Sequence, residues 1–298
     1  MIPEPLRRLV AAAFSVLSFF SEGMAAKAAF RLFTTPIGGR KVRISGARLE
    51  SALAVMDTAR QEIHDGIATW IWETGGETRT VVLVHGWTSM SLYMTSLVEP
   101  LRGAGFRVVA FDFPGHGESA GTQLTSDHAA GLAVGIADRF GRTALVGHSF
   151  GASMCVIAAS GAPTLEPSPN IEALVLVAGA NELQGVTQRF ADQFGIGPRV
   201  KRRLDQRLEK IGGAPIDRFS TVNGVRAAGV PTLLVHDQGD TIVPFSDAEA
   251  VHAETGAELV ETARLGHNRI LYSRSVHRVI VEFVAKHVPA EDATAGVA

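Results

Sequence analysis

Several features that define whole classes of protein are missing from this chain of 298 residues. It has a single cysteine, Cys155, which excludes an internal disulfide, and no Cys/His cluster has the spacing of a metal site. Lys and Arg number 28 against 30 Asp and Glu, so the net charge gives no electrostatic case for a nucleic-acid partner, whose phosphates would require a basic face. We therefore expect no nucleic-acid partner, no metal and no cofactor.

Long hydrophobic runs are lacking as well. The apolar stretch at residues 9–20 is shorter than the roughly 20 residues that a helix needs to cross a bilayer, so we expect no transmembrane anchor. Its apolar residues repeat at helical spacing opposite polar ones such as Arg8 and Ser15. We interpret residues 1–38 as a retained amphipathic helical segment that packs on the body, docks a partner or lies on a membrane surface.

A cleaved signal peptide is the alternative for this segment. Arg7 and Arg8 precede the apolar stretch, and Ala26-Lys27-Ala28 has the small-x-small form of a cleavage site. Against cleavage, Glu4 and two prolines dilute the leading positive charge. Retention predicts a cytoplasmic protein with an optional peripheral membrane contact, whereas cleavage of residues 1–28 predicts an exported one.

The chain does contain enough apolar residues for a large core, since they make up 46% of the sequence. From about residue 39 onward, short Val/Leu/Ala-rich runs typical of strands buried on both faces alternate with longer helical patterns. This alternation predicts an α/β fold of three layers, with a mostly parallel central sheet and helices on both faces. The expected strands are KVRIS, IATWIWETG, TVVLVHG, RVVAFDFPG, TALVGHS, ALVLVAGA, VPTLLVHD and AELVETA, and the expected helices span 91–104, 126–140, 150–161 and 273–287.

One segment interrupts this alternation. Residues 181–229 separate two expected strands and are far more than a single crossover helix needs. We interpret them as a helical cap inserted over the carboxyl ends of the strands, where ligands of such sheets bind. Residues 39–298 are then one α/β domain that carries this cap.

A serine between two glycines follows one of the expected strands. In ALVGHSFGASMCV, Ser149 stands between the strand run and a helical run of small residues. Gly147 and Gly151 lack the Cβ atoms that would clash in a tight strand-to-helix corner, which is the setting of a nucleophilic serine. Because a serine hydroxyl is a weak nucleophile near neutral pH, it needs a histidine base that an acid orients.

The base and the acid are expected downstream. His267 stands in a Gly-His loop before the last expected helix, whereas the other downstream candidates fall in helical patterns. In the loop after VPTLLVHD, Asp240 is placed to reach His267, and Asp237 is expected to stabilise the turn. Glu182, just after the preceding strand, is the alternative acid.

Backbone amides are the expected donors to an oxyanion that develops on an attacked carbonyl. The N–H of Phe150 opens the helix after the serine, and the N–H of Trp87 follows Gly86 at the end of an earlier strand. Apolar residues near the expected site predict a substrate with an apolar acyl or alkyl group. Besides Trp87 and Phe150, the residues expected to bind it are Met90, Phe190 and Phe194.

Five short motifs occur in an order found in one large enzyme family. They are HGW at 85–87, DFPGHGES at 112–119, GHSFG at 147–151, HDQGDTIVP at 236–244 and GHNRIL at 266–271. By these motifs the chain resembles the α/β-hydrolase-fold serine hydrolases over roughly residues 65–290. The resemblance implies Ser149, Asp240 and His267 as a catalytic triad, with Trp87 and Phe150 as oxyanion donors. Relatives with dehalogenase or epoxide hydrolase activity carry an aspartate where this chain has Ser149, so acyl transfer is favoured.

The sequence thus predicts a serine hydrolase that cleaves a small-molecule carboxylic ester through an acyl-enzyme intermediate. The same residues would serve a lysophospholipase, a monoacylglycerol lipase, a thioesterase, a C–C bond hydrolase or a perhydrolase, and these alternatives stay open. A non-catalytic binding protein of this fold is disfavoured because all three triad candidates are present. The sequence does not predict an oligomeric state.

Overall fold

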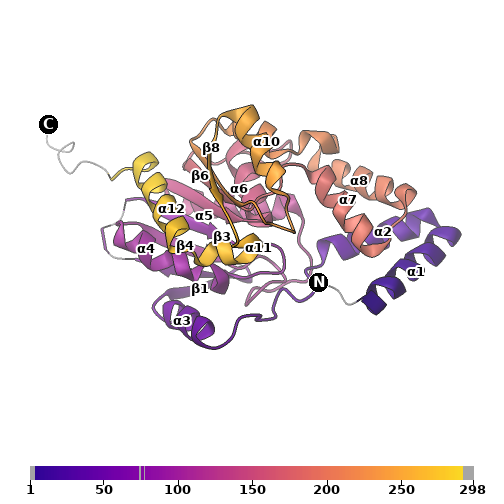
Figure 1. Ribbon diagram of the computed structural model, residues 1–298, viewed down its shortest axis with the longest axis horizontal. Helices are drawn as coiled ribbons and strands as arrows, with labels where there is room; N and C mark the ends of the chain where they lie inside the picture. The colour runs from indigo at the N-terminus through magenta and orange to yellow at the C-terminus, as the bar shows by residue number, and fades with distance from the viewer. Residues whose placement is uncertain (1–3, 74, 77, 291–298) are drawn as a thin grey trace.

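A computed structural model describes residues 4–73, 75–76 and 78–290, and its centre is an eight-stranded sheet with helices on both faces (Figure 1). The strand order is β1-β2-β4-β3-β5-β6-β7-β8, in which β2 runs antiparallel to β1 and β4 and the remaining neighbours are parallel. This is the three-layer α/β fold that the sequence predicts. The strands are β1 (Arg60–His64), β2 (Ile67–Trp72), β3 (Thr80–Val84), β4 (Arg107–Phe111), β5 (Thr143–His148), β6 (Ile171–Val177), β7 (Thr232–Asp237) and β8 (Glu258–Thr262).

The helices on the two faces follow the expected strand–helix alternation. In the described residues, the 3₁₀ helices η1 (Ser91–Leu97), η2 (Ile216–Arg218) and η3 (Ile270–Tyr272) supplement the α-helices. The α-helices are α1 (Glu4–Phe20), α2 (Glu22–Thr34), α3 (Ala47–Met56), α4 (Val98–Gly103), α5 (Ser126–Phe140), α6 (Phe150–Ser160), α7 (Leu183–Phe194), α8 (Pro198–Gly212), α9 (Thr221–Ala228), α10 (Phe245–Thr255), α11 (Gly266–Arg269) and α12 (Arg274–His287).

Central strand β3 shows how the sheet creates a core on each face. Because successive side chains of a strand point to opposite faces, Val81 and Leu83 pack in the core beneath α4 and α12, while Val82 and Val84 pack in the core beneath α5 and α6. All four side chains are fully buried. A strand buried on both faces has no polar alternation, which explains the near-continuous apolar runs of the sequence.

The first edge of the sheet differs from the sequence-based expectation. KVRIS at 41–45 forms no strand; the edge strand β1 is Arg60–His64 instead, and it follows helix α3. β1 has the sequence RQEIH and is largely exposed. An exposed edge strand of charged and polar residues carries no apolar periodicity, so the pattern that identifies the buried strands is absent from it.

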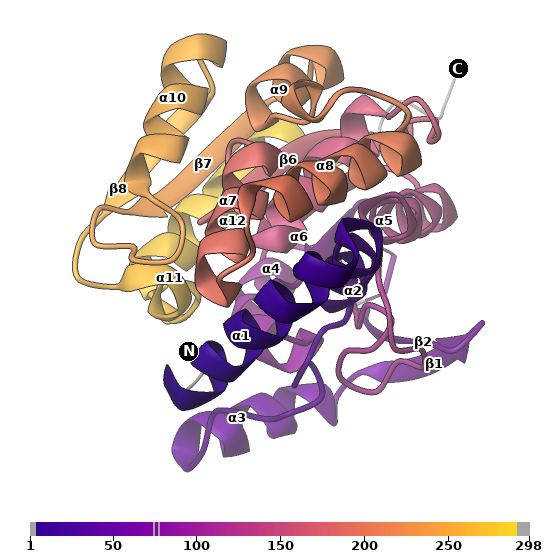
Figure 2. The same ribbon diagram turned by 90° about the vertical axis from the view of Figure 1, so that its right-hand side faces the viewer.

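The N-terminal segment forms a helical hairpin, α1 and α2, that packs on the expected cap. Figure 2 shows α1, α2, α7 and α8 lying side by side. They share a small core to which α1 contributes Phe14 and α7 contributes Phe194. Residues 1–3 of the expected N-terminal segment 1–38 and residues 291–298 of the expected domain 39–298 lie outside the described residues. Among those described, no helix is both long enough and apolar enough to cross a membrane.

Not all of residues 181–229 lies over the strand ends as a cap. Helix α9 packs on α6 in one of the two layers that cover the sheet, and its Val225 joins the core on that face. A Cβ on Gly224 would collide with the Val156 side chain of α6, which shows how closely the two helices approach. The part that stands apart from the sheet and against the hairpin is therefore α7 and α8.

The contact between α6 and β3 predicts a strong effect of one methyl group. A Cβ on Gly151 would overlap the Val84 carbonyl and lie 2.6 Å from the His85 oxygen. Gly151→Ala should lower the free energy of unfolding by about 1–3 kcal/mol or more, as overpacking does. Gly135→Ala is the matched control, because Gly135 is exposed in α5 with open space around it. That substitution should raise stability by about 0.5–1 kcal/mol. Urea unfolding followed by circular dichroism measures the stability of both variants. A Gly151→Ala variant as stable as the wild type would contradict this packing.

Candidate active site

The site is built on a sharp corner between β5 and α6. Ser149 lies between the two elements with φ of 54° and ψ of −118°, a conformation that residues with a side chain rarely adopt. Its N–H donates to the Val177 oxygen of β6 at 2.8 Å, and its C=O accepts from the Ala152 N–H at 3.0 Å. These bonds hold the corner at the carboxyl edge of the sheet.

Close backbone packing accounts for the glycines around this serine. A Cβ on Gly147 would lie 2.5 Å from the Gly151 oxygen and 2.6 Å from the Ala152 nitrogen, so only glycine allows α6 to turn back against β5. A Cβ on Gly86 would lie 3.2 Å from the Cβ of Ser149. Gly86 therefore lets the loop after β3 approach the serine.

Three side chains from distant parts of the sequence form one hydrogen-bonded chain at this corner. Nε2 of His267 lies 2.9 Å from Oγ of Ser149, and Nδ1 of His267 lies 2.7 Å from Oδ2 of Asp240. The pairs are 118 and 27 positions apart in the sequence. Because a carboxylate only accepts, Nδ1 of His267 carries a proton, and in the neutral ring Nε2 is then the acceptor that faces the serine hydroxyl.

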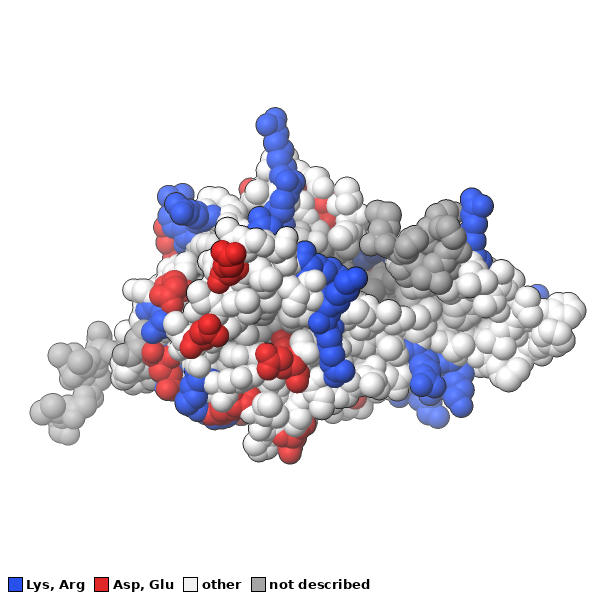
Figure 3. Space-filling view, turned by 90° about the horizontal axis from the view of Figure 1, so that it is seen from below, with Lys and Arg blue, Asp and Glu red and all other residues white. Residues whose placement is uncertain are grey.

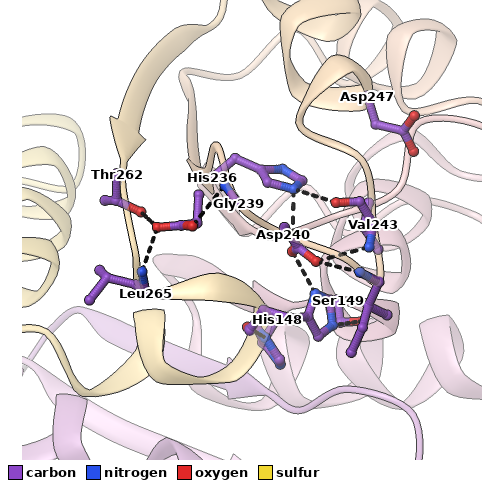
Figure 4. A network of polar contacts seen from close by, with 12 residues as sticks. His148, Ser149, His236, Gly239, Asp240, Val243, Asp247, Thr262 and Leu265 are labelled. Atoms are coloured by element: carbon purple, nitrogen blue, oxygen red, sulfur yellow. Dashed lines mark hydrogen bonds and ion pairs between the residues drawn. The ribbon is translucent and has the colours of Figure 1, made fainter. Parts of the chain in front are cut away.

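Asp240 is held as a carboxylate. Its Oδ1 accepts from the N–H groups of Ile242 at 2.8 Å and Val243 at 3.0 Å, and His236 approaches Oδ2 to 3.5 Å (Figure 4). Burial by itself would raise the pKa of Asp240, but the hydrogen bonds from His236, His267 and the backbone hold it well below its ordinary value. The group beside His267 is therefore negatively charged at neutral pH.

Sequence reasoning missed two histidines that support the hydrogen-bonded chain of Ser149, His267 and Asp240. His236 lies between Asp240 and the Val243 oxygen, to which its Nε2 is 3.0 Å distant. His148, next to the serine, places Nε2 2.8 Å from the backbone oxygen of His267, with the two rings 4.9 Å apart. The motifs GHSFG and HDQGD contain both residues, but only the fold shows their partners.

The two amides expected as oxyanion donors lie beside the serine. The ring of Trp87 meets that of Phe150 edge to face, with centroids 5.3 Å apart. In the part of the chain that the structure describes, neither the Trp87 N–H nor the Phe150 N–H donates to a protein acceptor. Both amides are thus free to donate to a ligand, which is the property that an oxyanion site requires.

Buried neutral histidines brace the loops beneath the site. Nε2 of His85 accepts from the Phe113 N–H at 3.0 Å, and Nε2 of His116 accepts from the Thr88 N–H at 3.1 Å. Burial lowers the pKa of His85 to about 4 and that of His116 to about 3. Burial also lowers the pKa of His148 to about 3, with the neighbouring His267 adding to the effect.

The remaining acidic candidates have other partners. Asp237 accepts from the Gly239 and Leu265 N–H groups, both at 2.9 Å, and from the Thr262 hydroxyl at 2.8 Å, so it stabilises the turn as expected (Figure 4). Glu182, the alternative acid, is exposed before α7 and its backbone pairs with Ser220. The position beside Nδ1 of His267 is taken by Asp240.

The expected substrate-binding residues all take part in packing within the protein. Met90 is 5% exposed and packs beneath α3, and Phe194 is 8% exposed in the core between the cap and the hairpin. The Phe190 ring packs edge to face on Phe33 of α2, with centroids 5.0 Å apart. The N-terminal elements α2 and α3 pack against these side chains, and a contact between any of the three and a substrate stays a prediction.

The neutral histidines predict a loss of stability in mild acid. Each ring binds a proton in the unfolded chain below about pH 6.5 but stays neutral in the folded protein. The contribution of the neutral rings to the free energy of unfolding is therefore complete above about pH 6.5. It is lost as the pH falls from about 6.5 towards the lowered pKa values of the folded protein, at up to about 1.4 kcal/mol per pH unit for each ring. Asp112, whose pKa burial raises, acts in the opposite direction, so a variant comparison is needed.

The comparison uses urea unfolding of the wild type and His116→Gln across this range. His116→Gln should be less stable above about pH 7, and its stability should depend less steeply on pH, by up to one proton, because the substituted side chain does not titrate. His64→Gln is the control, since His64 is exposed on β1. Identical slopes for wild type and His116→Gln would contradict a neutral buried His116.

Curated proteins resemble the chain over most of its length. The dihydrolipoyllysine-residue acetyltransferase components of the acetoin cleaving systems of Pseudomonas putida and Cupriavidus necator are 27% identical over 263 residues and 30% identical over 241 residues. These matches cover 76% and 68% of this chain, and 69% and 62% of those proteins. The chain therefore spans about two thirds of the length of these relatives.

Solved structures and a family model agree on the fold. An esterase of Pyrococcus furiosus has a TM-score of 0.59 at 21% identity, covering 77% of this chain and 92% of that one. A monoacylglycerol lipase of Paleococcus ferrophilus has a TM-score of 0.54 at 24% identity, covering 74% and 99%. Residues 81–282, which include the serine, the aspartate and the histidine of the hydrogen-bonded chain, match the model of the alpha/beta hydrolase family. The chain belongs to the alpha/beta hydrolase family.

Proposed function

We propose that this protein is a serine hydrolase that cleaves carboxylic esters through an acyl-enzyme intermediate. The observation that carries the proposal is the hydrogen-bonded chain from the Ser149 hydroxyl through His267 to Asp240. It joins a nucleophile, a base and an orienting carboxylate in the arrangement that activates a serine for acyl transfer. The likeness to structures of esterases and a lipase in the same fold supports it.

In the first half of the reaction, Oγ of Ser149 attacks the ester carbonyl carbon while Nε2 of His267 takes the hydroxyl proton. The tetrahedral intermediate collapses when the bond to the alcohol oxygen breaks, and His267 returns the proton to the leaving alcohol. In the second half, His267 takes a proton from water, whose oxygen attacks the acyl-serine. Ser149 leaves with that proton, and the carboxylic acid is released.

Two electrostatic features would lower the barrier to these steps. Asp240 stays ionised, so it stabilises the positive charge that His267 acquires when the serine is deprotonated. The negative charge on the former carbonyl oxygen would be met by the N–H groups of Trp87 and Phe150. The strained serine corner contributes by holding the hydroxyl in place before the substrate arrives.

The site favours an ester with an apolar group. The partly exposed rings of Trp87 and Phe150 flank the backbone of the serine corner and provide apolar contact area for an acyl or alkyl chain. The sequence attributes further contacts to Met90, Phe190 and Phe194, which also take part in packing. Carboxylic esters, monoacylglycerols and thioesters all satisfy this requirement.

Replacement of the nucleophile tests the proposal. Ser149→Ala should lower kcat on p-nitrophenyl butyrate by about 10⁴-fold or more, because the members of such a triad act as a unit. A fluorophosphonate should add one adduct to the wild type by intact mass and none to this variant. Ser160→Ala, at the last turn of α6, is the matched control and should keep wild-type activity. Wild-type turnover by Ser149→Ala would exclude the mechanism.

His148 is expected to be a positioning residue in this reaction. Its Nε2–H donates to the backbone oxygen of His267, so it fixes the segment that carries the base without touching the ester. His148→Leu leaves that buried oxygen without its donor and should lower kcat by about tenfold or more with a smaller change in KM. His148→Gln keeps an N–H donor and should restore part of kcat. Equal loss in both variants would indicate a packing role only.

A further inference from the structure

Helix α1 is apolar on two sides, and only one of them is covered. Phe14 is 8% exposed and packs with the partly buried Val10 and Leu17 in the core shared with α2 and α7. On a second stripe, about a third of a turn around the helix, Leu9 is 67% exposed, Val16 60% and Phe20 76%. The spacing of these residues along the chain places them on one helical stripe, with Ala12 and Ala13 between them.

The exposed stripe widens where α1 ends and the chain turns into α2. Phe19 is 86% exposed and lies edge to face with Phe20, the two ring centroids being 5.4 Å apart. Met24, in the first turn of α2, is 54% exposed. We call Leu9, Val16, Phe19, Phe20 and Met24 the hairpin face. An exposed apolar surface with two adjacent aromatic rings at its tip is typical of a docking surface.

The charge around the hairpin face is positive, unlike that of the remaining protein. The sequences of α1, α2, α7 and α8 contain eleven Lys and Arg against five Asp and Glu, a net charge of +6 within a chain whose net charge is −2. Figure 3 shows that the end of the molecule opposite the C-terminus is uncharged and bordered by Lys and Arg, with no acidic side chain on that part of the visible face.

The acidic residue of the hairpin that is best placed to oppose this charge is already paired. Glu22, at the start of α2, approaches Arg203 to 3.2 Å and Arg199 to 3.4 Å. Lys27 and Arg31 are exposed on α2 and follow Met24 at helical spacing, and Arg202 is exposed on α8, the helix packed against α2. Apolar residues bordered by basic side chains match the two layers of an anionic lipid surface, acyl chains beneath negative headgroups.

We propose that the hairpin face docks this protein on a bilayer that contains anionic lipid, with α1 lying in the plane of the interface. Phe19, Phe20 and Met24 enter the acyl region, and the basic side chains of α2 and α8 contact the headgroups. Two copies of the protein joined through this face would bring two strongly positive ends together, which disfavours a dimer there. The 17 residues of α1 give a helix shorter than a bilayer core, in agreement with a helix that lies along the surface.

Docking at this surface would hold the cap at the membrane. α7 packs against α1 through Phe194, and the Phe190 ring packs on Phe33 of α2, so the hairpin and the cap form one unit. A Cβ on Gly195, at the end of α7, would lie 2.5 Å from the Cβ of Ala11, which shows how close the helices are. The docking itself requires no catalysis and is measured separately from the proposed hydrolase activity.

Co-sedimentation of the full chain with vesicles tests the proposal. The chain should bind phosphatidylcholine vesicles that contain about 30% phosphatidylglycerol, bind pure phosphatidylcholine vesicles at least about tenfold more weakly, and dissociate in about 0.5 M NaCl. The double variant Phe19→Ser/Phe20→Ser should lose more than about tenfold in partition coefficient, since both rings leave the acyl region. Ile63→Ser is the matched control, because Ile63 is 68% exposed on β1, away from the hairpin.

The outcomes separate the proposal from its competitors. All variants should keep wild-type thermal stability and turnover of p-nitrophenyl butyrate, because the substituted side chains are exposed and outside the site. Equal vesicle binding by the wild type and the Phe19/Phe20 double variant would overturn the proposal. So would equal binding to vesicles with and without phosphatidylglycerol. A lipid-free dimer in light scattering that the Phe19→Ser/Phe20→Ser substitutions dissociate would also overturn it, in favour of a second copy as the occupant.

Discussion

The β5–α6 corner is the constraint on which the rest of the site depends. A serine can hold a left-handed backbone conformation only if its surroundings compensate for the strain, and here that compensation comes from close packing. Gly147 and Gly151 let α6 approach β5 and β3 to distances that any side chain would prevent, and Gly86 brings the neighbouring loop beside the serine. The same approach brings the two free amides beside Ser149, so the proposed nucleophile and the proposed oxyanion donors depend on one packing arrangement.

The carboxylate that contacts His267 is that of Asp240. Asp240 is kept ionised by hydrogen bonds from two histidines and two backbone amides, whereas burial keeps His85, His116 and His148 neutral. A neutral ring offers one donor and one acceptor, which lets these residues connect loops without adding charge near His267. Asp240, 2.7 Å from His267, would compensate the positive charge that His267 acquires during the proposed reaction.

Much of the fold and of the candidate site could be predicted from local patterns. The central strands are continuous apolar runs because both faces are buried, and α5 begins and ends where the pattern indicates. Strand β1 was missed because an exposed edge strand has no apolar pattern to detect. Met90, Phe190 and Phe194 were assigned to substrate because a sequence shows that a residue is apolar but not which surface covers it. Met90 packs beneath α3, Phe190 packs on α2, and Phe194 packs in the core that α7 shares with α1 and α2.

The sequence by itself determined the class of fold, the corner at Ser149 and the identity of Asp240 and His267 as its candidate partners, because glycine spacing, strand composition and motif order are local properties. Only the tertiary structure decided what depends on contacts between distant segments. It placed His267 within 2.9 Å of Ser149, gave His236 and His148 their partners, and covered one apolar side of α1 while leaving the other exposed. A helix with two apolar sides has two sides that can pack, and only the neighbouring helices determine which one faces solvent.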